Sequence, residues 1–212
     1  MPSSSQWLAF LVASILFIQV PGPSLLFTIG RALTVGRRDA LLSVVGNGIG
    51  LMVQVALVAV GLGAVVAASA SAYTTIKLIG AAYVIYLGVQ AIRHRGDARL
   101  ALEATADAPP RPSTAWSSVR TGVIVGATNP KTIVFFVAFL PQFTSDAGDP
   151  GIALGVLGLV FGAMAITSDS IWALAASKAR DWFSSRPQRL DRLGATGGLM
   201  MVGLGTTMVL AD

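Results

Sequence analysis

Residues 122–140 are Gly122-Val-Ile-Val-Gly-Ala-Thr-Asn-Pro-Lys-Thr-Ile-Val-Phe-Phe-Val-Ala-Phe-Leu140, an apolar stretch about as long as a membrane-spanning helix. One lysine, Lys131, lies inside it, directly after a proline. A second apolar stretch, residues 158–176, contains one aspartate, Asp169. A charge in the middle of a bilayer costs roughly 2.5–3.5 kcal/mol on insertion scales, so such residues usually face a polar cavity, pair with another group or line a transport path. These two charges therefore indicate a transporter.

The composition of the whole chain favours membrane embedding. Of its 212 residues, 54% are hydrophobic and 12% are charged, whereas a soluble domain has about 25% charged residues. The formal net charge of +5 is explained below by membrane topology, so no nucleic-acid partner is predicted. The chain has no cysteine, which excludes disulfides and thiolate metal sites. The predicted fold class is an all-α integral membrane protein.

Six apolar stretches predict six transmembrane helices, at about residues 7–30, 40–68, 74–92, 119–140, 152–177 and 194–210. Basic residues gather in the first, third and fifth connecting loops, whereas the second loop has no charge and the fourth has only acids. Loops rich in Lys and Arg stay on the cytoplasmic side. We therefore expect a multi-pass protein of the plasma (inner) membrane with both termini outside. The basic loop residues are Arg31, Arg37, Arg38, Arg93, Arg95, Arg99, Arg111, Arg120, Lys178, Arg180, Arg186, Arg189 and Arg192.

A polar segment divides the chain into two halves of three spans each. Halves with an odd number of spans have opposite orientations in the membrane, which is the arrangement of an inverted repeat. We expect a first three-helix repeat at 1–95, a cytoplasmic linker at 96–118 and a second three-helix repeat at 119–212. The opening span of each half has proline near its middle, in Pro21-Gly22-Pro23 and Asn129-Pro130-Lys131. Proline removes a backbone donor and clashes with the preceding turn, so helices 1 and 4 are predicted to be broken there.

The predicted breaks and the polar residues lie at one depth. Counted at about 1.5 Å per helical residue from the nearest basic loop residues, Pro21, Pro23, Asn47, Lys131 and Asp169 lie roughly 12–16 Å inside. This is near the middle of a hydrocarbon core about 30 Å thick, and it predicts one polar cavity. Each residue also has a structural alternative. The prolines could be packing kinks, Asn47 could bond across a helix pair, Asp169 could be a neutral acid packed against neighbouring serines, and Lys131 could extend to the headgroups.

Four pairs of glycines have the spacing that lets membrane helices approach closely. We expect them to be packing sites, some of them at the interface of a homodimer, which is one possible assembly. The pairs are Gly46 with Gly50, Gly122 with Gly126, Gly158 with Gly162, and Gly194 with Gly198.

Several motifs follow one another along the chain. They are Val20-Pro-Gly-Pro-Ser24, Gly46-Asn-Gly-Ile-Gly50, Lys77-x-x-Gly-Ala-Ala-Tyr-x-x-Tyr-Leu-Gly88, Asn129-Pro-Lys-Thr132 followed by Phe139-Leu-Pro-Gln-Phe143, and Asp169. In this combination the chain resembles the LysE/RhtB family of amino-acid exporters over nearly its whole length. The resemblance implies a six-helix exporter of amino acids or related small metabolites that is driven by the proton gradient. It does not supply the substrate.

The opposite charges at one depth predict a substrate site that works by alternating access. The carboxylate of an amino acid or a similar small zwitterion would meet Lys131 and the half-helix N-termini. Its ammonium would meet Asp169 or the carbonyls that the prolines free, and Asp169 would also bind the coupling proton. Whether Lys131 and Asp169 pair directly stays open. The predicted substrate-binding residues are Pro21, Gly22, Pro23, Asn47, Asn129, Pro130, Lys131 and Asp169.

Three other functions compete with this prediction. An exporter of a divalent metal would need several carboxylate, histidine or thiolate ligands, but Asp169 is the one acidic residue inside a predicted span. An intramembrane enzyme would need a second acid, a histidine or a cysteine near a nucleophile. A non-transport scaffold would not need buried charges. We therefore expect no enzymatic activity, no metal and no cofactor, with membrane lipid as the surrounding partner.

Overall fold

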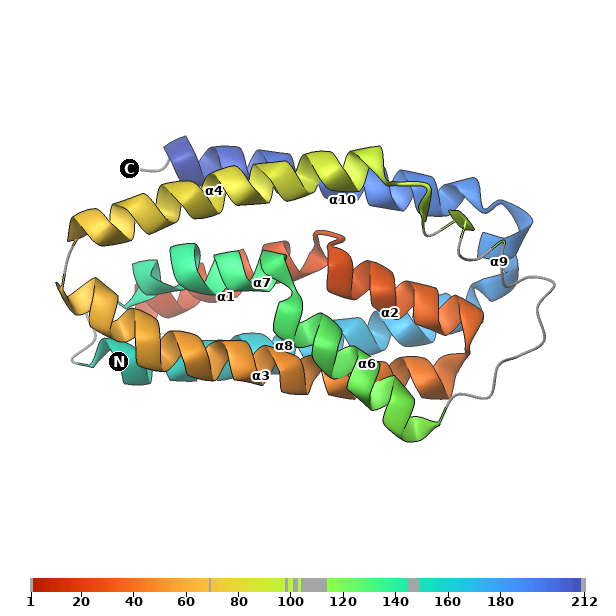
Figure 1. Ribbon diagram of the computed structural model, residues 1–212, viewed down its shortest axis with the longest axis horizontal. Coiled ribbons are helices and arrows are strands. Elements are labelled where there is room, and N and C mark those ends of the chain that lie inside the picture. Colours follow the sequence, from red (N-terminus) through yellow and green to blue (C-terminus); the bar gives the residue numbers. More distant parts are fainter. Residues whose placement is uncertain are drawn as a thin grey trace.

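The computed structural model describes residues 2–68, 70–97, 99–100, 103, 114–144 and 149–210, and the regular structure of this part is helical throughout. Figure 1 shows an elongated bundle whose helices run between its two ends. Between α7 and α8 the chain forms a π-helical turn (Phe135–Phe139) and a 3-10 turn (Leu140–Phe143). The helices are α1 (Ser4–Gln19), α2 (Pro23–Thr34), α3 (Arg37–Ala68), α4 (Ala70–Arg93), α6 (Ala115–Thr128), α7 (Pro130–Val134), α8 (Pro150–Lys178), α9 (Arg180–Ser185) and α10 (Gln188–Leu210).

The first predicted break is confirmed. Helix α1 ends at Gln19, Val20 has an extended backbone, and α2 begins at Pro23 with Gly22 as its N-cap. The two helices meet at an angle of 48°. Proline is well placed in the first turn of a helix, where its missing N–H would have no helical partner. Pro23 therefore begins α2, the second half of the broken helix.

The second predicted break is confirmed as well. Helix α6 ends at Thr128, Asn129 is extended, and α7 begins at Pro130. The Asn129 side chain caps α7 by accepting a hydrogen bond of 3.1 Å from the Lys131 backbone N–H. The π-helical and 3-10 turns then interrupt the regular helix a second time, and Pro141 lies in the latter. The helix that opens each predicted half, α1 with α2 or α6 with α7, is thus irregular near the middle of the bundle.

Most helices extend a few residues beyond the predicted apolar stretches, and α10 and α6 show why. Helix α10 begins at Gln188, six residues before the last stretch, because its first turns are polar and add no hydropathy signal. Helix α6 begins at Ala115, where the Thr114 side chain accepts a hydrogen bond from Ser117 N and caps it. The last residues of the predicted linker 96–118 are therefore helical. Most of the remaining linker lies outside the described residues.

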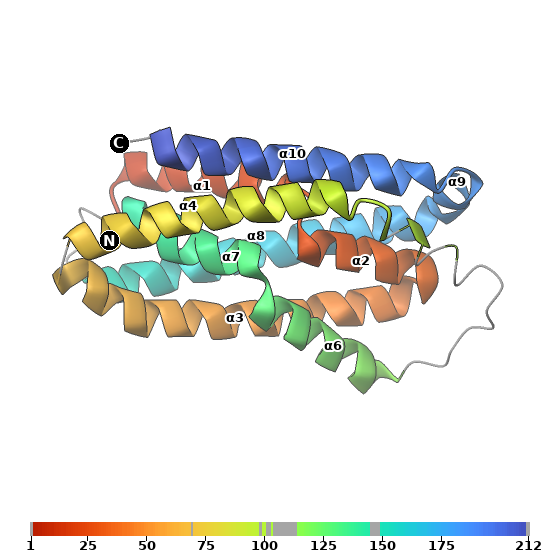
Figure 2. The ribbon, with the colours of Figure 1, turned by 45° about the horizontal axis from the view of Figure 1, so that its top comes forward.

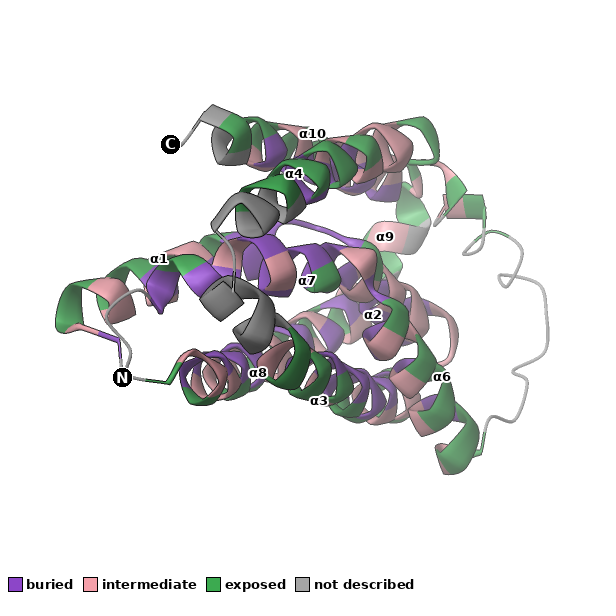
Figure 3. Cartoon of the chain, turned by 60° about the vertical axis from the view of Figure 1, so that its left-hand side comes forward, coloured by how far each residue is buried: buried purple, intermediate pink, exposed green. Residues whose placement is uncertain are grey.

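Many large apolar side chains are exposed along the helices, as on a lipid-facing surface. Arg37–Gly61, Ala115–Phe143 and Pro150–Lys178 are each long and apolar enough to cross a membrane, and the bent pair α1 and α2 is a fourth candidate span. Figure 3 shows exposed residues along the outer faces of the helices and buried residues between them. Val60 on α3 has an exposed fraction of 83% and Leu57 one of 69%. Soluble proteins rarely leave apolar patches of this kind uncovered. The chain is an all-α membrane protein.

Glycines bring α3 and α6 into backbone contact. A Cβ atom on Gly46 would lie 2.0 Å from the Val119 carbonyl oxygen, and one on Gly122 would lie 2.1 Å from the Ser43 carbonyl oxygen. Helices α4 and α10, which lie side by side in Figures 1 and 2, meet in the same way at Gly88 and Gly198. The predicted packing role is confirmed within the chain for Gly46, Gly122 and Gly198. The homodimer stays a prediction.

The two ends of the bundle differ in charge. Figure 1 places both termini at one end, and it places the turn between α2 and α3, the C-terminal end of α4 and helix α9 at the other. The described residues of the three basic loops lie at this second end, which we call the basic end.

Candidate functional site

A small buried cavity lies between the two helix breaks, and we call it the polar chamber. Its volume is about 40 Å³, little more than the roughly 30 Å³ that one water molecule occupies in the liquid. Asn47 reaches it from α3, Asp169 from α8 and Lys131 from α7, and the exposed fraction of each is below 9%. The lining residues are Phe17, Ile18, Gly22, Ser24, Leu25, Asn47, Leu51, Asn129, Lys131, Thr132, Phe161, Ala165 and Asp169.

The polar chamber collects five of the eight residues predicted from the sequence. These are Gly22, Asn47, Asn129, Lys131 and Asp169. Pro21 and Pro23 line a larger neighbouring cavity instead. Pro130 begins α7 and lines neither cavity.

A chain of hydrogen bonds joins the second break to Asp169. The Asn129 amide donates to the Ser24 hydroxyl at 3.0 Å, which donates to Asn47 Oδ1 at 2.9 Å. The Asn47 amide in turn donates to Asp169 Oδ2 at 3.1 Å. Within the described part of the chain this is the one hydrogen bond that Asp169 receives through its carboxylate. A carboxylate can accept about four, so Asp169 keeps acceptor capacity toward the chamber.

The Lys131 ammonium is held by the end of α1. It donates to the carbonyl oxygens of Phe17 and Val20, both at 2.6 Å, and lies 4.4 Å from the centroid of the Phe17 ring. The last carbonyls of a helix have no helical donor and carry its negative dipole end, so a cation is favourable there. The break at Pro21-Gly22-Pro23 thus creates the site that binds Lys131. Although Lys131 and Asp169 line the same chamber, no ion pair within 4.0 Å joins these two described residues.

The carbonyls at the second break are satisfied by a glutamine. Gln54 Nε2 on α3 lies 2.8 Å from Gly126 O, 3.1 Å from Ala127 O and 3.3 Å from Asn129 O. The Thr132 hydroxyl completes the group by donating to Gln54 Oε1 at 2.7 Å. Each break therefore has its own polar side chain from another helix, a lysine at the first and a glutamine at the second.

These contacts bear on the structural alternatives for Lys131, Asp169 and Asn47. Lys131 does not extend to the headgroups, because it is buried with an exposed fraction of 5% and bonded to α1. Asp169 is bonded to Asn47 rather than to a neighbouring serine, and Ser168 instead accepts from Gln19 Nε2 at 3.2 Å. Asn47 does bond across helices, as the structural alternative proposed, and it does so inside the chamber.

Ser24 is the polar contact that sequence reasoning missed. It ends the Val20-Pro-Gly-Pro-Ser24 motif and links Asn129 to Asn47. A hydroxyl directly after a helix break inside an apolar stretch was a usable signal, but serine is also common as an ordinary residue of membrane helices.

A second cavity of about 560 Å³, which we call the vestibule, extends from the break to the basic end. Its inner end is formed by Pro21, Gly22 and Pro23, and its wall is completed by α4 and α10, with His94 at the basic end. Arg31 also lines the vestibule, and its guanidinium donates to the hydroxyls of Ser43 and Ser118 at 3.2 and 2.7 Å. These bonds join α2 to α3 and α6.

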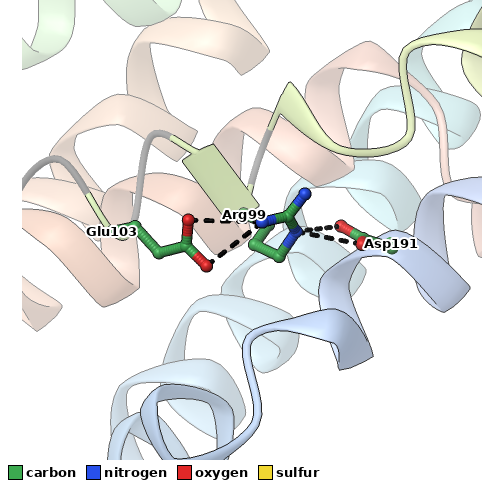
Figure 4. Close-up of polar contacts among 3 residues, drawn as sticks. All are labelled: Arg99, Glu103 and Asp191. Carbon is green, nitrogen blue, oxygen red and sulfur yellow. Dashed lines mark hydrogen bonds and ion pairs between the residues drawn. The ribbon is translucent and has the colours of Figure 1, made fainter.

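An ion-pair cluster holds the segment after α4 against α10. Figure 4 shows the Arg99 guanidinium between Glu103 and Asp191, with closest distances of 3.2 and 3.0 Å. Hydrogen bonds to Glu103 and Asp191 raise the pKa of Arg99 above its ordinary value. The cluster keeps this segment near the basic end of α10.

The described residues include no group of three or more His, Cys, Asp or Glu side chains that could hold a metal ion. The polar chamber has one carboxylate, three amide or hydroxyl side chains at hydrogen-bond distance from one another, and one ammonium. This donor set suits an organic ion with charges of both signs better than a metal.

Comparisons with known proteins agree with the motifs. A homoserine/homoserine lactone efflux protein of Salmonella typhimurium is 31% identical over 209 residues, which cover 97% of this chain and 96% of the relative. A leucine efflux protein of Klebsiella pneumoniae is 27% identical over 207 residues, 95% of this chain and 93% of the relative. A Vibrio cholerae protein named uncharacterized membrane protein is 35% identical over 210 residues, 97% of each chain.

No solved structure matches the chain. The model of the LysE type translocator family matches residues 15–212, which include both breaks and every residue of the polar chamber. The chain therefore belongs to the LysE type translocator family.

Proposed function

We propose that this protein is a secondary transporter that exports amino acids or related small zwitterions from the cytoplasm in exchange for protons. Membership of a translocator family and relatives named for amino-acid efflux support this class. The observation that carries the proposal is the polar chamber itself. It places a buried carboxylate with spare acceptor capacity and a buried ammonium in one cavity, which is the complement of a zwitterion.

The arrangement of the helices supports six spans built as an inverted repeat. In this proposal α1 with α2, α3 and α4 form the first half, and α6 with α7, α8 and α10 form the second. Each half then opens with a helix broken at a proline. The second helix of each half supplies one polar residue to the chamber, Asn47 from α3 and Asp169 from α8. The basic end would face the cytoplasm, which leaves both termini outside the inner membrane.

The substrate would enter through the vestibule and bind by exchanging partners with the protein. Its ammonium would bind Asp169, and its carboxylate would bind Lys131. An amino acid is several times larger than the chamber, so its binding requires α1 and α2 to move apart from α7 and α8. The present arrangement would be the empty, closed state of an alternating-access cycle.

Asp169 is the proposed proton site. A proton that arrives from outside would neutralise the carboxylate, remove the attraction for the substrate ammonium and favour the empty state. We also propose that the chain is a transporter rather than an enzyme. The Ser24 hydroxyl, a potential nucleophile in the chamber, is bonded to two amides and not to a base. A homodimer stays a prediction without a defined interface.

Efflux from proteoliposomes tests the proposal. Vesicles containing the purified protein are loaded with radiolabelled homoserine, leucine or other amino acids, and efflux is measured with and without an inward proton gradient. We expect saturable efflux of at least one amino acid that the gradient accelerates. Lys131→Met and Asp169→Asn should abolish it, whereas the exposed control variants Lys178→Met and Asp181→Asn should retain it. Normal efflux by both chamber variants would refute the proposal.

A further inference from the structure

Among the described residues, Gly22 is the one that lines both the vestibule and the polar chamber. The vestibule measures about 560 Å³ and the chamber about 40 Å³. The two cavities therefore meet at the backbone of Gly22. What lies against this residue decides whether the passage is open.

The Lys131 side chain occupies the space that a side chain at Gly22 would need. A Cβ atom on Gly22 would lie 2.6 Å from Lys131 Cδ and 3.5 Å from both Cε and Nζ. The ammonium beyond this point is bound to the carbonyls of Phe17 and Val20. Lys131 thus crosses the passage from α7 and is anchored to α1 on the other side.

Displacing Lys131 leaves the Val20 carbonyl in need of a new donor, whereas the Phe17 carbonyl keeps the Val20 N–H. The Val20 carbonyl has no other donor within the described residues, and a buried carbonyl without a donor is unfavourable. A substrate ammonium has three N–H donors. It can take the place of the lysine ammonium at the carbonyls of Phe17 and Val20, or it can bind Asp169 beside them. A substrate carboxylate can accept the released Lys131 ammonium. A carboxylate alone leaves the Val20 carbonyl without a donor, and an amine alone brings two cations together.

We propose that Lys131 is the inner gate between the vestibule and the polar chamber, and that a zwitterion opens it. The carboxylate of the zwitterion binds the Lys131 ammonium, and its own ammonium replaces lysine at the carbonyls of α1 or binds Asp169. This inference rests on the proposed export function and narrows its substrate class to molecules with an ammonium and a carboxylate. Gly22 is a positioning residue, because its missing side chain is the space in which the closed gate lies.

Thiol labelling tests the gate without measuring transport. The chain has no cysteine, so single cysteines report one position each. Ala91→Cys places a thiol in the vestibule on α4, and Ala165→Cys places one in the polar chamber on α8. Inside-out vesicles expose the basic end to the charged reagent MTSET. We expect Ala165→Cys to react roughly tenfold more slowly than Ala91→Cys, the ratio produced by a barrier of about 1.4 kcal/mol.

Opening the gate by mutation should remove this difference. Lys131→Met deletes the ammonium, and Gly22→Ala displaces the lysine stem while retaining it. Each should raise the labelling rate of Ala165→Cys close to that of Ala91→Cys. Gly30→Ala is the matched control, because a Cβ atom there has no neighbour within 4 Å on the same helix, α2. It should leave Ala165→Cys protected. Rapid labelling of Ala165→Cys in the parent, or slow labelling in both gate variants, would overturn the gate.

Ligands test the zwitterion requirement separately. The amino acid that proteoliposomes export should accelerate labelling of Ala165→Cys, as far as it does not itself shield the thiol. Its deaminated and decarboxylated analogues, isocaproate and isoamylamine in the case of leucine, should not. If either analogue acts as well as the amino acid, the partner exchange is wrong, although the gate and the export function can both stand. If no amino acid is exported while the gate variants behave as expected, the export proposal fails and the gate does not.

Discussion

Replacing Gly46 by alanine adds one methyl group where α3 and α6 touch through their backbones. The new Cβ atom would lie 2.0 Å from Val119 O, 2.9 Å from Val119 C and 2.9 Å from Val123 N, whereas real Cβ contacts essentially never fall below 3.0 Å. All three neighbours are backbone atoms, so no change of side-chain rotamer relieves the overlap. The two helices must separate by about 1 Å, the difference between the first distance and that limit.

The expected loss follows from two opposing effects. Overpacking a tight contact typically costs about 1–3 kcal/mol. Alanine is a better helix former than glycine by roughly 0.5–1 kcal/mol, which offsets part of this cost. From the midpoints of these two ranges we therefore expect Gly46→Ala to lower the free energy of unfolding by about 1 kcal/mol. Asn47 is the next residue in the chain, so a shift of α3 also disturbs the polar chamber, and amino-acid efflux should fall.

Gly61→Ala is the matched control in the same helix. A Cβ atom on Gly61 has no neighbour within 4 Å, so the helix-forming gain alone remains. We expect the free energy of unfolding to stay unchanged or to rise by up to about 1 kcal/mol. Unfolding in mixed micelles, followed by circular dichroism as the fraction of denaturing detergent rises, compares both variants with the parent. Equal stability of Gly46→Ala and the parent, or an equal loss in both variants, would refute the packing argument.

Three further predictions concern polar contacts. Gln54→Leu should lower the free energy of unfolding in mixed micelles by about 1–3 kcal/mol, because it leaves the carbonyls of Gly126 and Ala127 without their side-chain donor; an unaffected variant would contradict this role. Ser24→Ala should slow efflux, because it removes the hydrogen-bonded link between Asn129 and Asn47. Ser24→Thr retains the hydroxyl and should keep much of the efflux rate. Equal efflux by both variants would argue against the link. Any efflux that remains in Asp169→Asn should no longer respond to an imposed pH gradient in proteoliposomes, and a persisting response would place the proton site elsewhere.

The sequence was sufficient to predict where the rods break and that Lys131 and Asp169 share a cavity. Proline has strong local effects on the backbone, and a charge in an apolar stretch must find a polar surrounding, so both inferences depend on local chemistry. The family, too, followed from short motifs in a fixed order, and the comparison with the family model confirms it. The number of spans and the repeat stay predictions.

The partners of the polar groups could not be predicted in the same way. Lys131 binds backbone carbonyls of α1, more than a hundred residues away, and not Asp169. The rotation and tilt of the two broken helices against each other decide which face of α7 meets α1. The sequence pattern does not determine this rotation and tilt. The same limit applies to Ser24, whose importance arises from lying between Asn129 and Asn47 after the helices have packed.

A structure determined with the exported amino acid bound would test the central claim most directly. The account predicts the amino acid between α2, α3, α7 and α8, with its ammonium at hydrogen-bond distance from Asp169 and the Lys131 ammonium moved from Val20 O to the substrate carboxylate. An amino acid bound elsewhere, with Lys131 still on both carbonyls of α1, would contradict it.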